Sequence, residues 1–434
     1  MKGAFMEQFF KLKENGTTVR TEVLAGITTF LTMAYILAVN PIILADAGMP
    51  VDSVFMATAL ASFIATLVMA LVARLPFGLA PGMGLNAFFA LAVVVGMGKS
   101  WQFALTAVFL EGLIFILLTL FNVREAIINA IPDNLKKAIS VGIGLFVALI
   151  GLKNAGIIVD NPATLVGVGS LKAMPTLLAV IGLVVTGILL AFKVKGALLI
   201  GIVGTTLLGI PMGVTNIEGF KLFGPLPSLE PIFFKFEWNQ IFTLDMLIVL
   251  FTFLFVDMFD TVGTLIGVST KAGIVNKDGS IPRVKQALLA DAIGTTCGAI
   301  LGTSTVTTFV ESASGVEEGG RTGLTSLTTA ILFLIAIFFS PIFLMVPGAA
   351  TAPALILVGL FMMSPVASIN WTDFTESLPA FLTVVMMPFT YSISEGIVWG
   401  LLSYVIMKVA TGKAKNVSIV TYVVAGIFIL SFFV

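Results

Sequence analysis

The chain has 434 residues, of which 58% are hydrophobic and 11% charged, and its 23 basic side chains balance its 23 acidic ones. A mean hydropathy of +1.11 excludes a water-soluble domain of this size, so the surrounding solvent is lipid. Long apolar runs favour membrane-spanning helices over a β-barrel. Because histidine is absent and Cys297 is the single cysteine, we expect no disulfide scaffold and no metal site, and any proton chemistry must use carboxylates.

Hydropathy and helix-breaking residues divide the chain into about fourteen apolar segments. They cover residues 22-45, 54-73, 78-97, 102-121, 138-153, 175-193, 196-213, 243-268, 285-302, 304-320, 324-346, 350-365, 376-391 and 393-411. A further run, 417-434, either spans the bilayer or lies against it. If the N-terminus is cytoplasmic and the segments alternate, 18 of the 23 basic residues lie on the cytoplasmic side. We therefore predict an all-α polytopic protein of the cell (plasma or inner) membrane.

The longest polar interruption lies between the seventh and eighth segments and divides the chain into two halves of seven. Because seven is odd, the second half enters the membrane from the opposite side, as in the inverted repeats of secondary transporters. A short echo fits this plan, since Gly144-Leu145-Phe146 in the fifth segment recurs as Gly359-Leu360-Phe361 in the twelfth. The predicted domains are a first repeat over 1-214, a linker over 215-240 and a second repeat over 241-434.

The third segment of each half has a composition that disfavours a continuous helix. Residues 78-87, Gly-Leu-Ala-Pro-Gly-Met-Gly-Leu-Asn-Ala, hold one proline and three glycines, and residues 303-323 combine a β-branched run with several glycines and Glu311. Irregular backbone inside a membrane is tolerated where protein or a water-filled cavity supplies hydrogen-bond partners. We expect both segments to break near the midplane, the alternative being that the glycines only permit close helix packing.

Acidic residues within apolar segments are the best indication of function, because each costs about 2.5–3.5 kcal/mol at mid-helix. Asp257 and Asp260 are three residues apart on one helical face, so we expect at least one of them to hold a proton at neutral pH. Glu311, at the second break, can accept N–H groups from a planar heterocycle, and Phe309 can stack on its ring. Asn86 is the best polar partner in the first break. The alternative is that such carboxylates only tie helices together.

Several functional classes are disfavoured. No GxxxxGK[ST] string is present, so a nucleotide is not expected to drive the protein and a proton gradient is the expected energy source, with no cofactor. A channel would need a filter sequence that the chain lacks. We find no nucleophile or metal constellation that would indicate an enzyme.

Three stretches of the sequence resemble a known family. Residues 21-35, 80-87 and 307-312 are similar to the AzgA-like hypoxanthine/guanine/adenine permeases, a branch of the nucleobase-cation symporter and nucleobase-ascorbate transporter superfamily. The likeness extends over nearly the whole chain. It implies a 7+7 inverted repeat with a core domain (segments 1–4 and 8–11) and a gate domain (segments 5–7 and 12–14), short strands in segments 3 and 10, and frequent assembly as a homodimer.

The resemblance also implies roles for individual residues. Asp260 matches a carboxylate that binds the nucleobase, and Glu311 matches the glutamate that anchors it. Thr264 stands where uracil permeases have a histidine, which fits the purine branch. At the two breaks, the backbone amides of Phe309, Val310 or Ala80 are expected to face the base.

The function implied is symport of purine nucleobases (hypoxanthine, guanine and/or adenine) with protons, by alternating access. The expected partners are the base, the proton and the lipid bilayer, without nucleic acid. Asp260, Glu311 and Asp257 are the expected proton-coupling residues. An anion carrier or exchanger of the sulfate type on the same architecture is the alternative, although an acid at the substrate position repels anions.

Overall fold

The computed structural model describes residues 7–121, 132–275 and 281–431, and helices dominate these ranges. The first half contains α2 (Val19–Met33), α3 (Ile36–Ala45), α4 (Val51–Val68) with a π-helical end (Met69–Ala73), β1 (Leu79–Pro81), α5 (Met83–Ala87) with a π-helical continuation (Phe88–Gly96), α6 (Trp101–Leu120), α8 (Asp133–Asn154), β2 (Ile158–Asn161), β3 (Leu165–Val168), α9 (Met174–Ala191) and α10 (Ala197–Gly209).

The second half repeats this order of long and interrupted segments. It contains α11 (Leu244–Ala272), α12 (Val284–Leu301), β4 (Val306–Thr308), α13 (Ser312–Glu317), α14 (Gly323–Ala336), the 3₁₀ turn Ile337–Phe339, α15 (Ser340–Leu344), α16 (Gly348–Met362), the 3₁₀ turn Ser364–Ser368, α17 (Phe374–Thr390), α18 (Ile393–Ala410), the 3₁₀ turn Ala414–Asn416 and α19 (Ile419–Ser431).

Within the described residues, nine helical stretches are long and apolar enough to cross a membrane. They are Val19–Ala45, Val51–Ala73, Trp101–Leu120, Asp133–Asn154, Met174–Ala191, Leu244–Ser269, Gly323–Leu344, Gly348–Ser368 and Ile393–Ala410. Three shorter apolar helices cover Met83–Gly96, Ala197–Gly209 and Phe374–Thr390. The polytopic helical class is thus confirmed. The number fourteen is not confirmed in detail, because α12 and the strand-containing tenth segment fall outside both groups.

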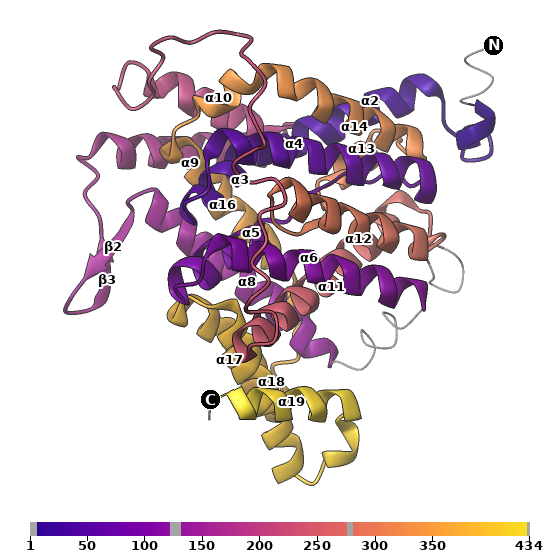
Figure 1. Ribbon diagram of the computed structural model, residues 1–434, viewed down its shortest axis with the longest axis vertical. Helices are drawn as coiled ribbons and strands as arrows, with labels where there is room; N and C mark the ends of the chain where they lie inside the picture. The colour runs from indigo at the N-terminus through magenta and orange to yellow at the C-terminus, as the bar shows by residue number, and fades with distance from the viewer. Residues whose placement is uncertain (1–6, 122–131, 276–280, 432–434) are drawn as a thin grey trace.

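The helices pack as two groups that correspond to the predicted core and gate. In the first group α2 packs against α13 and α14, and α12 packs against α4 and α6. In the second group α8 packs against α16, α17 and α18, and α9 packs against α10 and α16. Figure 1 shows α2, α4 and α14 in its upper half and α17, α18 and α19 at its lower end. A cavity between two such groups is the usual location of a transporter's site.

The repeated Gly-Leu-Phe strings meet in space. A Cβ placed on Gly144 of α8 would lie 2.6 Å from the carbonyl oxygen of Gly359, and one placed on Gly359 of α16 would lie 2.5 Å from the carbonyl oxygen of Gly144. The fifth and twelfth segments therefore cross backbone to backbone at equivalent residues. Such reciprocal contact is the relation that a pseudo-two-fold axis produces.

The predicted linker packs along the core. The amide of Phe234 donates to the carbonyl oxygen of Ile300 at 2.9 Å, and the ring of Phe236 lies 4.7 Å from that of Phe109 in α6. Ile232 is fully buried against Gly302. The connection between the halves is therefore part of the core surface, although its exact boundaries remain a prediction.

The C-terminal run forms α19, which packs against α18. Its Phe428 is buried and lies edge-on to Phe251 of α11, with ring centroids 5.4 Å apart. The last residues of the run, 432–434, lie outside the described residues.

The glycine crossing generates the first prediction. Replacing Gly144 or Gly359 with alanine forces α8 and α16 apart, because the new methyl group meets backbone atoms that cannot rotate away. Overpacking of this kind costs about 1–3 kcal/mol, and we expect a lower thermal unfolding midpoint in detergent. Gly187→Ala in α9 is the matched control, because nothing lies within 4 Å of its added Cβ. Equal midpoints for all three variants would contradict the crossing.

Candidate functional site

The two broken segments pair with each other inside the protein. β1 and β4 run antiparallel with Leu79 opposite Thr308, Ala80 opposite Thr307 and Pro81 opposite Val306. The pairing continues at both ends, where the Gly82 amide donates to the Thr305 carbonyl at 2.9 Å and the Phe309 amide donates to the Gly78 carbonyl at 3.0 Å. Both strands are buried. The predicted extended stretches in segments 3 and 10 are therefore confirmed, and each supplies partners for the other.

A threonine from the preceding helix holds the first residue of each strand. The hydroxyl of Thr66 in α4 donates to the carbonyl of Leu79 at 3.0 Å and accepts from its amide at 2.9 Å. The hydroxyl of Thr295 in α12 does the same for Val306, at 3.0 and 3.2 Å. One buried hydroxyl thus satisfies the N–H and C=O groups that the two-stranded pairing leaves unbonded at its outer edge. The same device occurs in both halves.

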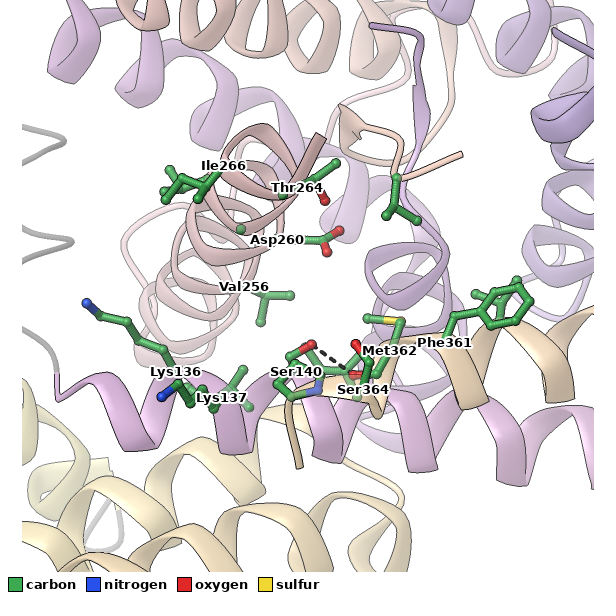
Figure 2. Close-up of a pocket in the computed structure, with 18 of the residues that line it drawn as sticks. Lys136, Lys137, Ser140, Val256, Asp260, Thr264, Ile266, Phe361, Met362 and Ser364 are labelled. Atoms are coloured by element: carbon green, nitrogen blue, oxygen red, sulfur yellow. Dashed lines mark hydrogen bonds between the residues drawn. The ribbon is translucent and has the colours of Figure 1, made fainter. Parts of the chain in front are cut away.

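A cavity of about 510 Å³ lies beside the strand pair, between the core and the gate. The core contributes α11 and the turn between β4 and α13, and the gate contributes α8 and α16. Figure 2 shows Asp260 and Thr264 on one helix above Ser140 and Met362 on the other side. The lining runs from Glu311 to Asp133 and Lys137 at the beginning of α8. The Asp133 side chain is exposed, so we take this end as the mouth.

One face of α11 forms a wall of the cavity. Asp260, Gly263, Thr264 and Gly267 recur at helical spacing and all line the space. Nothing lies within 4 Å of a Cβ added to Gly263 or Gly267, so no neighbouring helix packs against these two glycines, and they leave open space at the cavity wall. The carboxylate of Asp260 is therefore reached along a strip of helix that has little side-chain bulk.

Glu311 occupies the N-cap position of α13 and also lines the cavity. Its Oε1 accepts a hydrogen bond from the Tyr35 hydroxyl at 2.8 Å, and its carbonyl oxygen lies 3.4 Å from the donating hydroxyl of Thr32. Val310, next to it, lines the same space. The strand pair thus delivers Glu311 to the cavity, and Thr32 of α2 together with Tyr35, just after α2, holds it.

Asp257 and Asp260 diverge although they are only one helical turn apart. The side chain of Asp257 is fully buried, and its Oδ1 accepts from the Thr261 hydroxyl at 3.1 Å. The same hydroxyl lies 2.8 Å from Oδ1 of Asp291 in α12. The pair of acids that shares a bridging threonine is therefore Asp257 with Asp291, whereas Asp260 faces the cavity together with Glu311.

The remaining predicted residues lie behind the cavity wall. Asn86 is fully buried in α5 and donates to the Pro81 carbonyl at 3.3 Å. Ala80 and Phe309 are buried at the strand pair, and the Phe309 amide is already bonded to Gly78. None of Asn86, Ala80 and Phe309 lines the cavity, so their contact with a ligand stays a prediction. The expected absence of a metal and a cofactor also stays a prediction.

Sequence reasoning missed the gate side of the cavity and the tyrosine behind Glu311. Ser140 of α8 and Met362 of α16 line the space, and the Ser140 hydroxyl donates to the Met362 carbonyl at 3.1 Å, as drawn in Figure 2. The repeated Gly-Leu-Phe string could have pointed to this part of the gate, because Met362 directly follows Phe361, the last residue of the second string. For Tyr35 the sequence gives no signal beyond its place at the end of a motif.

These features define a class of protein, a polytopic membrane transporter with a cavity between a core and a gate. Solved structures have the same fold. The transmembrane domain of a cyanobacterium bicarbonate transporter, BicA, matches with a TM-score of 0.65 at 16% identity, covering 88% of this chain and 97% of that one. The murine Slc26a9 anion transporter in its inward-facing state matches with a TM-score of 0.65 at 11% identity, covering 94% of this chain and 72% of that one. At these identities the likeness concerns the fold alone.

The sequence comparisons give the family. The model described as the permease family matches residues 20–399, and the chain belongs to this family. A putative permease of Methanocaldococcus jannaschii is 51% identical, covering 99% of this chain and 98% of its own length. The adenine permease AdeP of Escherichia coli is 48% identical, with 98% and 95% covered. The guanine/hypoxanthine permease PbuG of Bacillus subtilis is also 48% identical, with 98% and 99% covered. The resemblance found in the sequence is thus confirmed.

The threonine clamps generate the second prediction. Thr66→Val and Thr295→Val each leave a buried N–H and C=O without the hydroxyl that bonds both, and such groups cost about 1–3 kcal/mol each. We expect a clear fall in the thermal unfolding midpoint in detergent. Serine keeps the hydroxyl, so Thr66→Ser and Thr295→Ser are the matched controls and should unfold nearer to the parent protein. If valine and serine variants unfold together, the hydroxyls do not hold the strands.

Proposed function

We propose that the protein imports purine nucleobases, namely hypoxanthine, guanine and/or adenine, together with protons. The observation that carries the proposal is the cavity into which Asp260 and Glu311 both face. Relatives that are 48% identical over nearly the whole chain carry the names adenine permease and guanine/hypoxanthine permease. The substrate class is taken from these names, and the chemistry of the cavity supports it.

The size and polarity of the cavity suit a planar heterocycle. Its volume of about 510 Å³ falls within the range of about 300–1,000 Å³ that is usual for small-molecule sites. A purine offers several N–H donors around a flat apolar face. Asp260 and Glu311 can accept from such donors, while Ile143, Val358 and Met362 give the apolar surface that covers a ring.

The same two carboxylates support proton coupling. They share one cavity in a chain without histidine, and two negative charges in a low-dielectric site repel each other. A proton that enters with the base relieves this repulsion. Asp257, joined through Thr261 to Asp291, lies one turn behind Asp260 and extends the acidic group into the core.

The anion-carrier alternative is the weaker one. This protein shares its fold with BicA and Slc26a9, which are named as bicarbonate and anion transporters, but a shared fold does not determine the substrate. Two acids at the inner end of the cavity repel an anion. Lys136 and Lys137 line the cavity at the beginning of α8, and Lys137 already pairs with Asp133 at 2.8 Å and donates to the Ser368 carbonyl at 3.1 Å.

The orientation belongs to the same proposal. With a cytoplasmic N-terminus in the plasma or inner membrane, the beginning of α8 also lies on the cytoplasmic side, because four segments precede it. The mouth of the cavity, at Asp133 and Lys137, then opens to the cytoplasm, which makes this an inward-open state. Assembly as a homodimer is proposed from the family resemblance.

An uptake assay tests the transport proposal. Cells that lack their own carriers and express this protein are given radiolabelled hypoxanthine, guanine, adenine, uracil or sulfate, with and without a protonophore. We expect uptake of at least one purine, collapsing when the protonophore removes the gradient, and no uptake of sulfate. Sulfate uptake would replace this proposal with the anion carrier, and purine uptake that withstands the protonophore would remove proton coupling.

The roles of the two acids are tested by amide substitution. Glu311→Gln and Asp260→Asn keep the shape of the side chain but remove its charge, and a lost hydrogen bond to a charged group is worth about 1.5–3 kcal/mol. We expect at least about a tenfold fall in the initial rate of purine uptake, at equal membrane abundance. Asp52→Asn, at an exposed position in the first turn of α4, is the control for the same chemical change. Normal uptake in both site variants would refute the assignment.

A further inference from the structure

Tyr35 lies where the first membrane segment is interrupted, between the end of α2 and the beginning of α3. Its side chain is 1% exposed, and its hydroxyl donates to Oε1 of Glu311 at 2.8 Å. Tyr35 does not line the cavity itself, so it reaches the site through Glu311. A buried tyrosine needs a partner for its hydroxyl, and here that partner is the carboxylate of the site.

The preceding helix, α2, packs against α13 and keeps this contact in place. Gly315 of α13 lies so close to α2 that an added Cβ would be 2.0 Å from Oγ1 of Thr29 and 2.6 Å from the carbonyl oxygen of Ala25. One turn further along α2, the Thr32 hydroxyl lies 3.4 Å from the Glu311 carbonyl oxygen. Packing therefore fixes the backbone at Glu311, and Tyr35 fixes its side chain.

The hydrogen bond from Tyr35 occupies only part of the acceptor capacity of the Glu311 carboxylate. A carboxylate has two oxygens and about four acceptor directions. Tyr35 takes one direction on Oε1, which leaves the second oxygen and the other acceptor directions of this cavity-lining residue available to a ligand. A glutamate held in one rotamer offers its acceptor without first losing conformational freedom, which is how a preorganised site gains affinity.

We propose that Tyr35 is a positioning residue of the site, whose hydroxyl aims the Glu311 carboxylate at an N–H group of the nucleobase. This inference rests on the proposed function for the identity of the ligand. It assigns to the first segment a part in substrate affinity, in addition to the eighth and tenth segments.

Tyr35→Phe removes the hydroxyl and keeps the ring that packs in the core. We expect KM for the transported purine to rise about two- to tenfold, because the freed Glu311 side chain must then be ordered when the base binds, while the maximal rate per transporter stays within about twofold. Tyr404→Phe is the matched control: Tyr404 is also buried, but it packs beside Lys408 in the gate. Its KM should equal that of the parent. A Tyr35→Phe protein with unchanged KM would overturn the proposal.

A second measurement separates positioning from a general loss of packing. The parent protein should bind a transported purine more tightly than its N-methylated analogues, because methylation removes the N–H group that donates a hydrogen bond to Glu311. The ratio of their inhibition constants in uptake should shrink toward one in Tyr35→Phe and stay unchanged in Tyr404→Phe. An unchanged ratio in Tyr35→Phe overturns the positioning role while leaving the proposed function intact. Failure of the parent protein to take up any purine would instead refute the proposed function.

Discussion

The structure depends on one constraint, that backbone polar groups inside a membrane must find partners within the protein. The third and tenth segments leave the helical path, and they survive in this environment because β1 and β4 bond to each other while Thr66 and Thr295 bond their outer edges. The pairing then decides where the chain resumes its helical course. Glu311 reaches the cavity because it stands at the N-cap of α13, three residues after Thr308, the last residue of β4.

The two repeats have similar backbone arrangements, but they offer different polar side chains to the cavity. Each strand is clamped by a threonine of the preceding helix, and Gly144 meets Gly359 at equivalent points of α8 and α16. The residues that follow the two strands differ, since Asn86 is buried behind the first break whereas Glu311 lines the cavity after the second. Asp260 also comes from the second half. The repeat therefore explains how the site is held, and departures from the repeat explain which polar groups it offers.

Sequence reasoning succeeded where one residue type has one structural consequence. Glycine and proline in a membrane segment predict a break, and the breaks occur at 79–81 and 306–308 as extended strands. The sequence could not specify the orientation of a side chain. Residues three apart on a helix point about 60° from each other, and this angle is enough to bury Asp257 beside Asp291 while Asp260 lines the cavity. Tyr35 gave no signal, because an aromatic residue in an apolar segment is ordinary core until its hydroxyl partner is known.

The buried Glu22 ties two parts of the core together. Its carboxylate accepts from the amides of Arg321, Thr322 and Thr325 at 2.8, 3.2 and 3.1 Å, at the beginning of α14. The same α2 contacts α13 further along, so one helix ties the tenth and eleventh segments together. Under the proposed function, breaking these buried bonds in each transport cycle would be costly, so we propose that the core moves as one body past α8 and α16. Asp260 and Glu311 would then travel together, and two ionised carboxylates would give resistance to this movement. Under the proposed function, the proton and the base lower that resistance, which links movement to loading.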